Sequence, residues 1–289
     1  MKRFKRIYIE TTNICNLNCS FCPKTKRKLQ TMSVENFRNV ISKVKDYTDY
    51  VYFHITGEPL NNVNLNQFLE ICENENLKVN ITTNGTLLLD KLEVLKNSKS
   101  VRKVSVSLHS FEANNLNTKL INYLTNVITS VKQLASNNII CELRLWNEDN
   151  HDAKTKNYNN LNTEILDFVS KGFGCEIMLD KLNQAKLSKN VFLKFDKVFD
   201  WPNLKSNSVN ENGFCYGLRT QLGILVDGTV VPCCLDNEGQ IVLGNIFNQN
   251  LEEILNSKLA KNIYDGFSNR KCYAELCKHC GYIQKFNIK

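Results

Sequence analysis

The chain has 289 residues, a formal net charge of +8 and 12 cysteines. It is long enough to bury a large core, either as one domain with an appendage or as two ordinary domains. No apolar segment precedes Glu10, which argues against a signal peptide, and no apolar run reaches membrane length. We therefore expect a cytoplasmic protein without a membrane segment, in which the cysteines serve as metal or cluster ligands rather than in disulfides.

Basic residues are concentrated over residues 24–28, which raises the question of nucleic-acid binding. No interleaved aromatic pattern or recognised binding motif accompanies this charge. Nucleic-acid binding is therefore not favoured. The basic cluster is better suited to steering an anionic ligand.

Strand-like and helix-like patterns alternate along residues 1–180. The predicted strands are residues 7–10, 50–55, 78–82, 103–107, 139–146 and 175–179. The predicted helices are residues 33–45, 65–76, 88–96, 119–136 and 161–169, the first with Ser33 as its N-cap. These repeats predict an α/β fold, a partial (β/α)6 TIM-like barrel open on one side, with its chemistry at the C-terminal strand ends.

A cysteine triplet follows the first predicted strand. Cys15, Cys19 and Cys22 have the spacing C-x3-C-x2-C. Three thiolates on one short loop can hold three irons of a four-iron cluster, which leaves the fourth iron free to bind a cofactor or a substrate. This arrangement indicates a catalytic site rather than an electron relay.

Polar residues follow the other predicted strands as well. Gly57 permits close backbone approach after the second strand, and Glu58 presents a carboxylate there. Asn84, Ser107 and Arg144 lie at the ends of the third, fourth and fifth strands. Because the C-terminal ends of parallel strands share one edge, these side chains are expected to converge.

Residues 1–180 resemble the core of radical S-adenosylmethionine (radical SAM) enzymes. The resemblance implies that Cys15, Cys19 and Cys22 are catalytic and bind a site-differentiated [4Fe-4S] cluster, whose open iron chelates S-adenosylmethionine. It places Phe21 beside the adenine, and it places Glu58 in the motif that meets the methionine amino group.

The resemblance extends to Gly57 and Ser107, whereas Asn84 and Arg144 are included because of their places at strand ends. Two of the matching segments depart from the family pattern. Gly57, Asn84, Ser107 and Arg144 complete the predicted set of cofactor-binding residues. Thr56 replaces the first Gly of the family's G-G-E-P motif, and His109 stands where the family commonly has Asp beside the ribose.

Residues 181–214 are expected to bridge the core to a C-terminal region. Phe192, Phe195, Phe199 and Trp201 recur at near-helical intervals, which predicts an amphipathic bridging helix. Beyond it, two short strands joined by Asp227-Gly228 predict a β-hairpin over residues 222–231, and a helix is expected near residues 251–259.

Four cysteines in residues 215–289 form a second candidate metal site, with Cys215 and Cys233 in the first part of the region and the pair Cys277-x2-Cys280 near the end. Their spacing resembles the small α+β SPASM/twitch domain of some radical SAM enzymes, which implies one auxiliary [4Fe-4S] cluster. Cys234 and Cys272 remain as substitute ligands. A structural zinc site is the alternative, because four thiolates with a C-x2-C pair also suit tetrahedral zinc.

The resemblance implies a reaction but leaves the substrate open. It implies reductive cleavage of S-adenosylmethionine to a 5'-deoxyadenosyl radical, abstraction of hydrogen from a substrate, and oxidation or cross-linking of that substrate. Peptides and small molecules are nearly equal candidates, and a flavodoxin- or ferredoxin-type protein is the expected electron donor. The alternatives are a non-catalytic iron-sulfur electron carrier and a zinc-ribbon RNA-binding protein.

Overall fold

The computed structural model describes residues 3–114, 116–147, 161–197, 200–207 and 209–286. A curved sheet of ten strands organises them, in the order β10-β9-β8-β1-β2-β3-β4-β5-β7-β6. The strands are β1 Arg6–Ile9, β2 Tyr50–Phe53, β3 Lys78–Thr83, β4 Val101–Ser107, β5 Ile140–Leu145, β6 Gln184–Ser188, β7 Val191–Phe195, β8 Gln221–Ile224, β9 Thr229–Val231 and β10 Gly244–Asn245. The central strands from β8 to β7 pair in parallel, and the outer ones pair antiparallel. This is the expected open α/β barrel.

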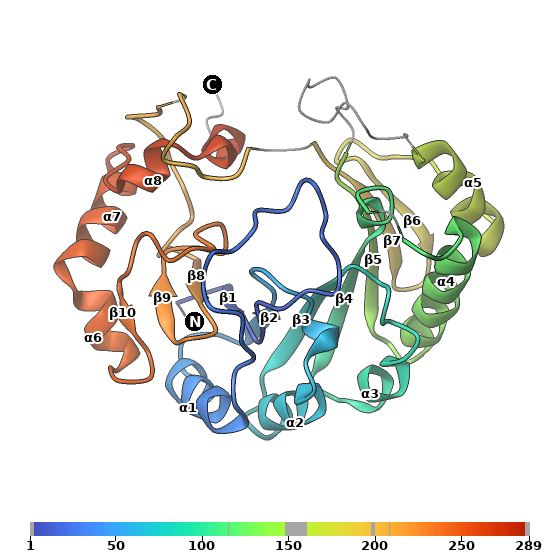
Figure 1. The fold of residues 1–289 in the computed structure, drawn as a ribbon, viewed down its shortest axis with the longest axis horizontal. Helices are drawn as coiled ribbons and strands as arrows, with labels where there is room; N and C mark the ends of the chain where they lie inside the picture. The colour runs from blue at the N-terminus through green and yellow to red at the C-terminus, as the bar shows by residue number, and fades with distance from the viewer. Residues whose placement is uncertain (1–2, 115, 148–160, 198–199, 208, 287–289) are drawn as a thin grey trace.

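Helices cover the outer side of the sheet (Figure 1). They are α1 Val34–Val44, α2 Leu65–Asn74, α3 Leu92–Asn97, α4 Leu120–Ser136, α5 Asn162–Phe173, α6 Leu251–Asn256, α7 Lys258–Ser268 and α8 Glu275–Lys278, with 3-10 turns η1 Pro59–Asn61, η2 Leu108–Ser110 and η4 Gly281–Phe286. Ser33 caps α1 as predicted, its hydroxyl accepting a hydrogen bond from the Asn36 N–H. None of the described helices is long and apolar enough to cross a membrane.

Period-two burial along the strands separates a helix-covered face from an inner face. In β5, for example, Cys141, Leu143 and Leu145 are fully buried, whereas the alternate residues are only partly buried. The buried face packs against helices, and the stacked rings of Phe37 and Phe68 join α1 to α2 with centroids 4.0 Å apart. The alternate residues therefore point into the interior of the barrel.

The predicted strand over residues 175–179 is wrong. Helix α5 continues past the predicted end to Phe173 and stops at Gly174 in a left-handed conformation, φ 65°. The residues that follow form no strand, and Met178 is 75% exposed. The sixth parallel strand of the barrel is instead β7, which pairs with β5.

The predicted bridging helix over residues 181–214 is also wrong. Phe192 and Phe195 lie in β7, which forms an antiparallel hairpin with β6, and Trp201 lies outside regular structure. Phe199 lies outside the described residues. The burial of β7 alternates with period two, so the near-helical spacing of its aromatic residues was the weaker signal.

The predicted C-terminal hairpin is confirmed as β8 and β9. Gly228 occupies its turn with φ 84°, where an added Cβ would lie 2.7 Å from Asn245 Oδ1. Strand β8 also pairs in parallel with β1, from Arg6 opposite Gln221 to Ile9 opposite Ile224. The C-terminal region therefore extends the barrel sheet, and its cysteines lie beside the barrel.

Candidate active site

The cysteine loop between β1 and α1 lies across the barrel opening (Figure 1). Cys15 is exposed, Cys22 is partly buried and Cys19 is buried, and all three are free thiols. Burial raises the pKa of each, that of Cys22 to about 11. Because metals bind the thiolate, a bound cluster would have to hold these groups deprotonated.

Several N–H donors are directed at the sulfur atoms of this loop. The Leu17 N–H donates to Cys15 Sγ at 3.4 Å, and the Asn114 side-chain amide donates to Cys19 Sγ at 3.1 Å. Such donors favour the thiolate and tune a cluster that it ligates. The donor chemistry of the loop therefore fits an iron-sulfur cluster. Asn114 belongs to no recognisable motif, so the sequence did not predict it as a site residue.

Asn13 closes the base of the cysteine loop. Its side-chain amide donates to the Lys28 carbonyl at 2.8 Å, and its side-chain oxygen accepts from the Gln30 N–H at 2.7 Å. Thr12 adds a bond from its hydroxyl to the Gln30 carbonyl at 3.2 Å. The two arms of the loop are therefore held together below the three cysteines.

A buried ion pair fixes the returning arm of the loop to the barrel. Both oxygens of Glu10, whose side chain is fully buried, accept hydrogen bonds from Arg27 at 2.7 and 2.8 Å. Glu10 also accepts from the Thr56 hydroxyl and the Val226 N–H. Arg27 donates in addition to the Asn237 carbonyl. One carboxylate thus joins the first strand, the cysteine loop, the loop after β2 and the C-terminal region.

Gly57 places the loop after β2 directly against the cysteine loop. Its φ is 76°, and an added Cβ would lie 2.2 Å from the Thr12 carbonyl oxygen. The Glu58 N–H then donates to the Ile14 carbonyl at 3.0 Å. The close approach expected for Gly57 is present in the structure.

The carboxylate of Glu58 is held inside this corner and is 2% exposed. It accepts hydrogen bonds from the Thr83 hydroxyl and from the N–H groups of Leu60 and Asn84, at 2.7, 3.0 and 2.8 Å. Burial raises its pKa to about 7 despite these bonds. A carboxylate accepts about four hydrogen bonds, so one position is left for a ligand.

Asn84 connects the end of β3 to the cysteine loop. Its side-chain amide donates to Asn16 Oδ1 at 2.9 Å and lies 3.9 Å from Cys15 Sγ. Its carbonyl accepts from the Tyr123 hydroxyl. Asn84 therefore lies at the predicted cluster, as expected from its place at a strand end.

Phe21 and Ser107 each contact the 3-10 turn η2 after β4. The ring of Phe21 packs against His109, with centroids 4.8 Å apart. Ser107 is the last residue of β4, and its carbonyl accepts from the Ser110 hydroxyl at 2.7 Å. Burial lowers the pKa of His109 to about 4, so the ring is neutral near pH 7.

Arg144 extends from β5 into the barrel. Its guanidinium lies over the ring of Trp146 at 3.5 Å and pairs with Glu142 at 3.6 Å. Its Nε is the atom that faces Glu142, and it makes no hydrogen bond at that distance. Burial lowers its pKa, although Glu142 opposes the effect. The structure thus brings Arg144 to the inner face, where it can meet an acceptor on a ligand.

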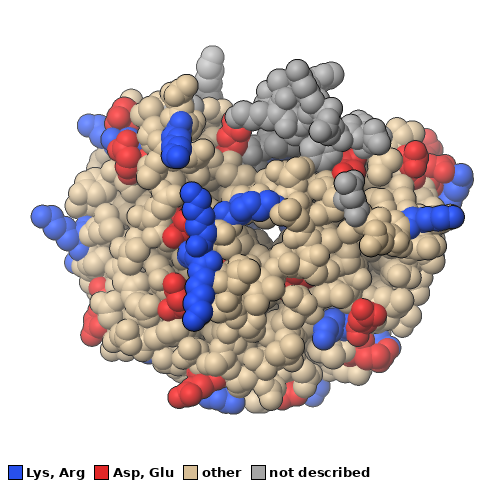
Figure 2. Space-filling model, viewed as in Figure 1, with Lys and Arg blue, Asp and Glu red and all other residues tan. Residues whose placement is uncertain are grey.

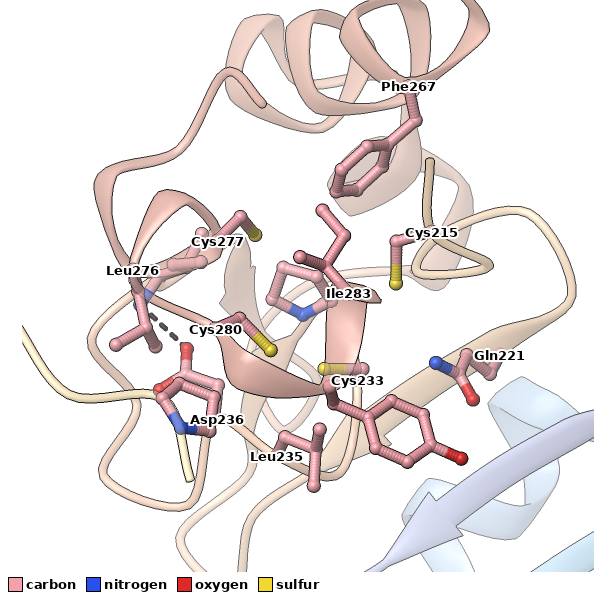
Figure 3. A pocket seen from close by; sticks show the side chains of 14 residues that line it. Cys215, Gln221, Cys233, Leu235, Asp236, Phe267, Leu276, Cys277, Cys280 and Ile283 are labelled. Carbon is pink, nitrogen blue, oxygen red and sulfur yellow. Dashed lines mark hydrogen bonds between the residues drawn. The ribbon is translucent and has the colours of Figure 1, made fainter. Parts of the chain in front are cut away.

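The four C-terminal cysteines line one cavity (Figure 3). The sulfur atoms of Cys215, Cys233, Cys277 and Cys280 are turned toward the same space. Burial is the main cause that raises the pKa of Cys233 well above its usual range, and the neighbouring thiols raise it further. Close, buried thiols cannot ionise together without a positive centre, so this donor set fits a metal cluster.

The two remaining C-terminal cysteines are not among the residues that line this cavity. Cys234 lies on the barrel side, where it packs against the buried cluster of Tyr8, Ile55, Leu225 and Val231. Cys272 lies with its sulfur next to Gly213.

Among the described residues, no group of three or more His, Cys, Asp or Glu side chains is arranged to hold a metal ion. A four-iron cluster occupies more space than one ion, so its ligand sulfurs need not approach one another as closely as those of tetrahedral zinc.

Two family models match the chain. Residues 9–144 match the radical SAM superfamily, and residues 215–281 match SPASM, an iron-sulfur cluster-binding domain. The chain is therefore a radical SAM protein with a C-terminal SPASM domain. Its cofactors are S-adenosylmethionine with a [4Fe-4S] cluster, and an auxiliary iron-sulfur cluster in the SPASM domain.

Individual relatives agree with this class. The chain is 26% identical over 306 aligned positions to the antilisterial bacteriocin subtilosin biosynthesis protein AlbA of Bacillus subtilis, covering 94% of this chain and 65% of that protein. It thus spans slightly less than two thirds of that relative. Members of the superfamily are enzymes.

Solved structures show the same fold. BtrN in complex with AdoMet and 2-DOIA has a TM-score of 0.61 at 17% identity, covering 97% of this chain and 94% of that chain. SuiB of Streptococcus suis bound to S-adenosylmethionine has a TM-score of 0.62 at 18% identity, covering 96% and 72%.

Proposed function

We propose that the protein cleaves S-adenosylmethionine reductively and uses the resulting radical to oxidise or cross-link a substrate. The observation that carries this proposal is the triplet Cys15, Cys19 and Cys22 on a loop clamped across the C-terminal mouth of a parallel barrel. When bound, the cofactors supply an electron and a 5'-deoxyadenosyl radical. The protein supplies the ligands, orients the cofactor and limits access of water.

We assign the cofactor-binding roles as follows. Glu58 offers its remaining acceptor position to the methionine ammonium, and its three internal bonds fix the direction of that position. Arg144 carries the positive charge suited to the methionine carboxylate. Gly57 and Asn84 hold these groups against the cysteine loop, while Phe21 and Ser107 line the nucleoside side.

We assign the auxiliary cluster to Cys215, Cys233, Cys277 and Cys280. These are the cysteines that line the C-terminal cavity. Four protein ligands would close the cluster to substrate, which leaves it an electron-transfer or structural role. Electron acceptance suits the oxidation of a substrate radical to a product.

Two substrate classes follow from the relatives. AlbA is named for the biosynthesis of a bacteriocin, and SuiB has been solved with a precursor peptide, which supports a peptide substrate. BtrN has been solved with the small molecule 2-DOIA, which supports a compact substrate. We further propose a cytoplasmic location and a flavodoxin- or ferredoxin-type electron donor.

The test is anaerobic incubation of the reconstituted, reduced protein with S-adenosylmethionine, followed by assay of 5'-deoxyadenosine. The triple replacement of Cys15, Cys19 and Cys22 by Ala should abolish the product while leaving the auxiliary iron bound. Cys175→Ala, at a partly buried free cysteine remote from both sets in the sequence, is the matched control and should retain activity. Product from the triple variant would contradict the assignment.

A further inference from the structure

Arginines and aromatic rings alternate along one row of side chains, all of them at least partly exposed. In order the row consists of Arg3, Tyr264, Arg219, Phe214 and Arg270, and we call it the arginine-aromatic row. The Cζ atoms of Arg3 and Arg219 lie 5.9 and 4.5 Å from the centre of the Tyr264 ring. Those of Arg219 and Arg270 lie 5.4 and 5.8 Å from the centre of the Phe214 ring. Each ring is therefore shared by two cations within the range of a cation–π contact.

The positive charge of the arginine-aromatic row is not neutralised by acidic residues. In the described part of the chain, no ion pair within 4.0 Å involves Arg3, Arg219 or Arg270. Arg3 donates to the Leu218 carbonyl at 3.3 Å, and Arg219 donates to the Ser268 hydroxyl, so both of these partners are uncharged. On the face of the molecule shown in Figure 2, by contrast, acidic side chains lie beside many of the basic ones. An aromatic ring holds a guanidinium in place without removing its charge, so the row can attract an acidic partner.

Further aromatic rings continue the row. Tyr216 is 43% exposed and packs edge-on against Phe214 and against Phe286, with ring centroids 5.1 Å apart in each case. Tyr282 follows, with its ring centroid 5.5 Å from that of Phe286. Arginine and aromatic residues are enriched in the energetically important parts of protein–protein interfaces, whereas lysine and glutamate are depleted there. The composition of this surface is therefore typical of a protein-docking site.

The same surface is joined to the four-cysteine cavity. Cys215, one of the cysteines that line the cavity, lies in the chain between Phe214 and Tyr216. Tyr282 lines the cavity as well, and its ring belongs to the exposed aromatic series. A protein bound to the row would therefore lie within about one residue of a proposed ligand of the auxiliary cluster.

The arginine-aromatic row lies at the end of the sheet opposite to the cysteine loop. Arg3 precedes β1 and Arg219 precedes β8, and these two strands are parallel neighbours. The cysteine loop instead follows the C-terminal end of β1. A partner bound to the row would therefore leave the mouth of the barrel open to the cofactor and the substrate.

We propose that the arginine-aromatic row docks an acidic redox protein of the [2Fe-2S] ferredoxin class, which takes an electron from the auxiliary cluster. This inference rests on the proposed function, because it supplies the exit for the electron that substrate oxidation releases. Loss of a hydrogen atom, followed by loss of one electron and one proton, oxidises the substrate by two electrons. The electron that reaches the auxiliary cluster then reduces the oxidised centre of the partner by one electron, which readies the cluster for the next turnover.

The test is binding of an oxidised, acidic [2Fe-2S] ferredoxin to the reconstituted protein, measured by anaerobic calorimetry at low and at high ionic strength. Binding to the wild type should weaken as salt is added, because exposed charges are screened. Arg270→Gln, at an exposed residue, should weaken binding at low salt by about fivefold or more, and adding Arg219→Gln should weaken it further. Lys186→Gln with Lys189→Gln makes the same change of charge at exposed residues in and next to β6, at the other edge of the sheet, and should leave binding unchanged.

Electron transfer provides a second measurement. The dithionite-reduced protein, freed of excess dithionite, should reduce the ferredoxin in a stopped-flow experiment, and the double arginine variant should do so more slowly. Reduction of riboflavin, a small neutral acceptor, should proceed at the same rate in both proteins. Equal slowing with riboflavin would mean that the arginines act on the cluster itself, and would overturn the docking role.

Three other results would also overturn the inference. They are a wild type that does not bind the ferredoxin, arginine and lysine variants that behave alike, and a polyglutamate peptide that binds as tightly as the ferredoxin. The last result would indicate an acidic peptide as the partner. Dithionite-driven formation of 5'-deoxyadenosine should be unchanged in the arginine variants and does not enter these measurements. Failure of the docking surface and failure of the proposed function are therefore seen in separate experiments.

Discussion

Arg27→Gln should destabilise the protein, because it leaves the buried carboxylate of Glu10 without its cation. The ion pair has both Glu10 oxygens within 2.8 Å of Arg27, whose side chain is 13% exposed. Removing one partner of a buried pair typically costs about 3 to 5 kcal/mol. Glu10 retains hydrogen bonds from the Thr56 hydroxyl and the Val226 N–H, so we expect a loss of about 3 kcal/mol, at the lower end of this range.

The assay is urea unfolding of the metal-free protein under reducing, anaerobic conditions, with the loss read as a lower midpoint at unchanged slope. Glu10→Gln combined with Arg27→Gln should recover about 1 kcal/mol or more relative to the sum of the single changes, because the unpaired charge is gone. Lys171→Gln, which breaks an exposed pair with Asp167, is the control and should leave the midpoint unchanged. An Arg27→Gln variant as stable as this control would refute the reasoning.

Further outcomes follow from the site. Gly57→Ala should lower the free energy of unfolding in urea more than Gly174→Ala. Both glycines have positive φ, but only at Gly57 would an added Cβ collide with the backbone, at the Thr12 carbonyl oxygen. Equal losses for the two variants would contradict this. Glu58→Ala should weaken S-adenosylmethionine binding by about 1.5 to 3 kcal/mol in calorimetry. Burial raises the folded-state pKa of Glu58 from 4.5 to about 7, so the folded protein binds more protons than the unfolded chain between these pH values. The metal-free protein should therefore lose up to about 3 kcal/mol of stability as pH rises through this window. In urea unfolding, Glu58→Gln should reduce this dependence of stability on pH. Replacing Cys277 and Cys280 by Ala should preserve formation of 5'-deoxyadenosine but stop the reaction before product, provided that the variant folds. A structure with an open iron at the auxiliary cluster would contradict the closed assignment.

The barrel and the cysteine triplet could be predicted because their signals are local. Three thiols within eight residues, directly after a strand, define a ligand loop without any knowledge of the rest of the chain. Burial also alternates with period two in β2 and β5, where the buried positions are apolar residues. Short-range patterns were therefore sufficient for most of the fold.

The contacts that fix the site could not be predicted because they join distant segments. Arg27 meets Glu10 across 17 positions, and Val226 meets it across 216. The available signal was a charged Glu10 directly after an apolar strand, but its partner could have been any of many basic residues. The errors at residues 175–179 and 181–214 have a related cause, since pairing with β5 decided which apolar segment became the sixth strand.

The pairing of β8 with β1 joins the region of the cysteine loop to the region of the four C-terminal cysteines. Cys233 lines the four-cysteine cavity, whereas its neighbour Cys234 packs against the buried cluster that contains Tyr8 of β1. Only one peptide unit therefore separates a proposed auxiliary-cluster ligand from a residue in contact with the inner face of the barrel. A substrate held inside the barrel would therefore have a short path for an electron to the proposed auxiliary cluster. The sheet that carries the cysteine loop at the end of β1 thus also carries the region of the proposed auxiliary-cluster ligands beside β8.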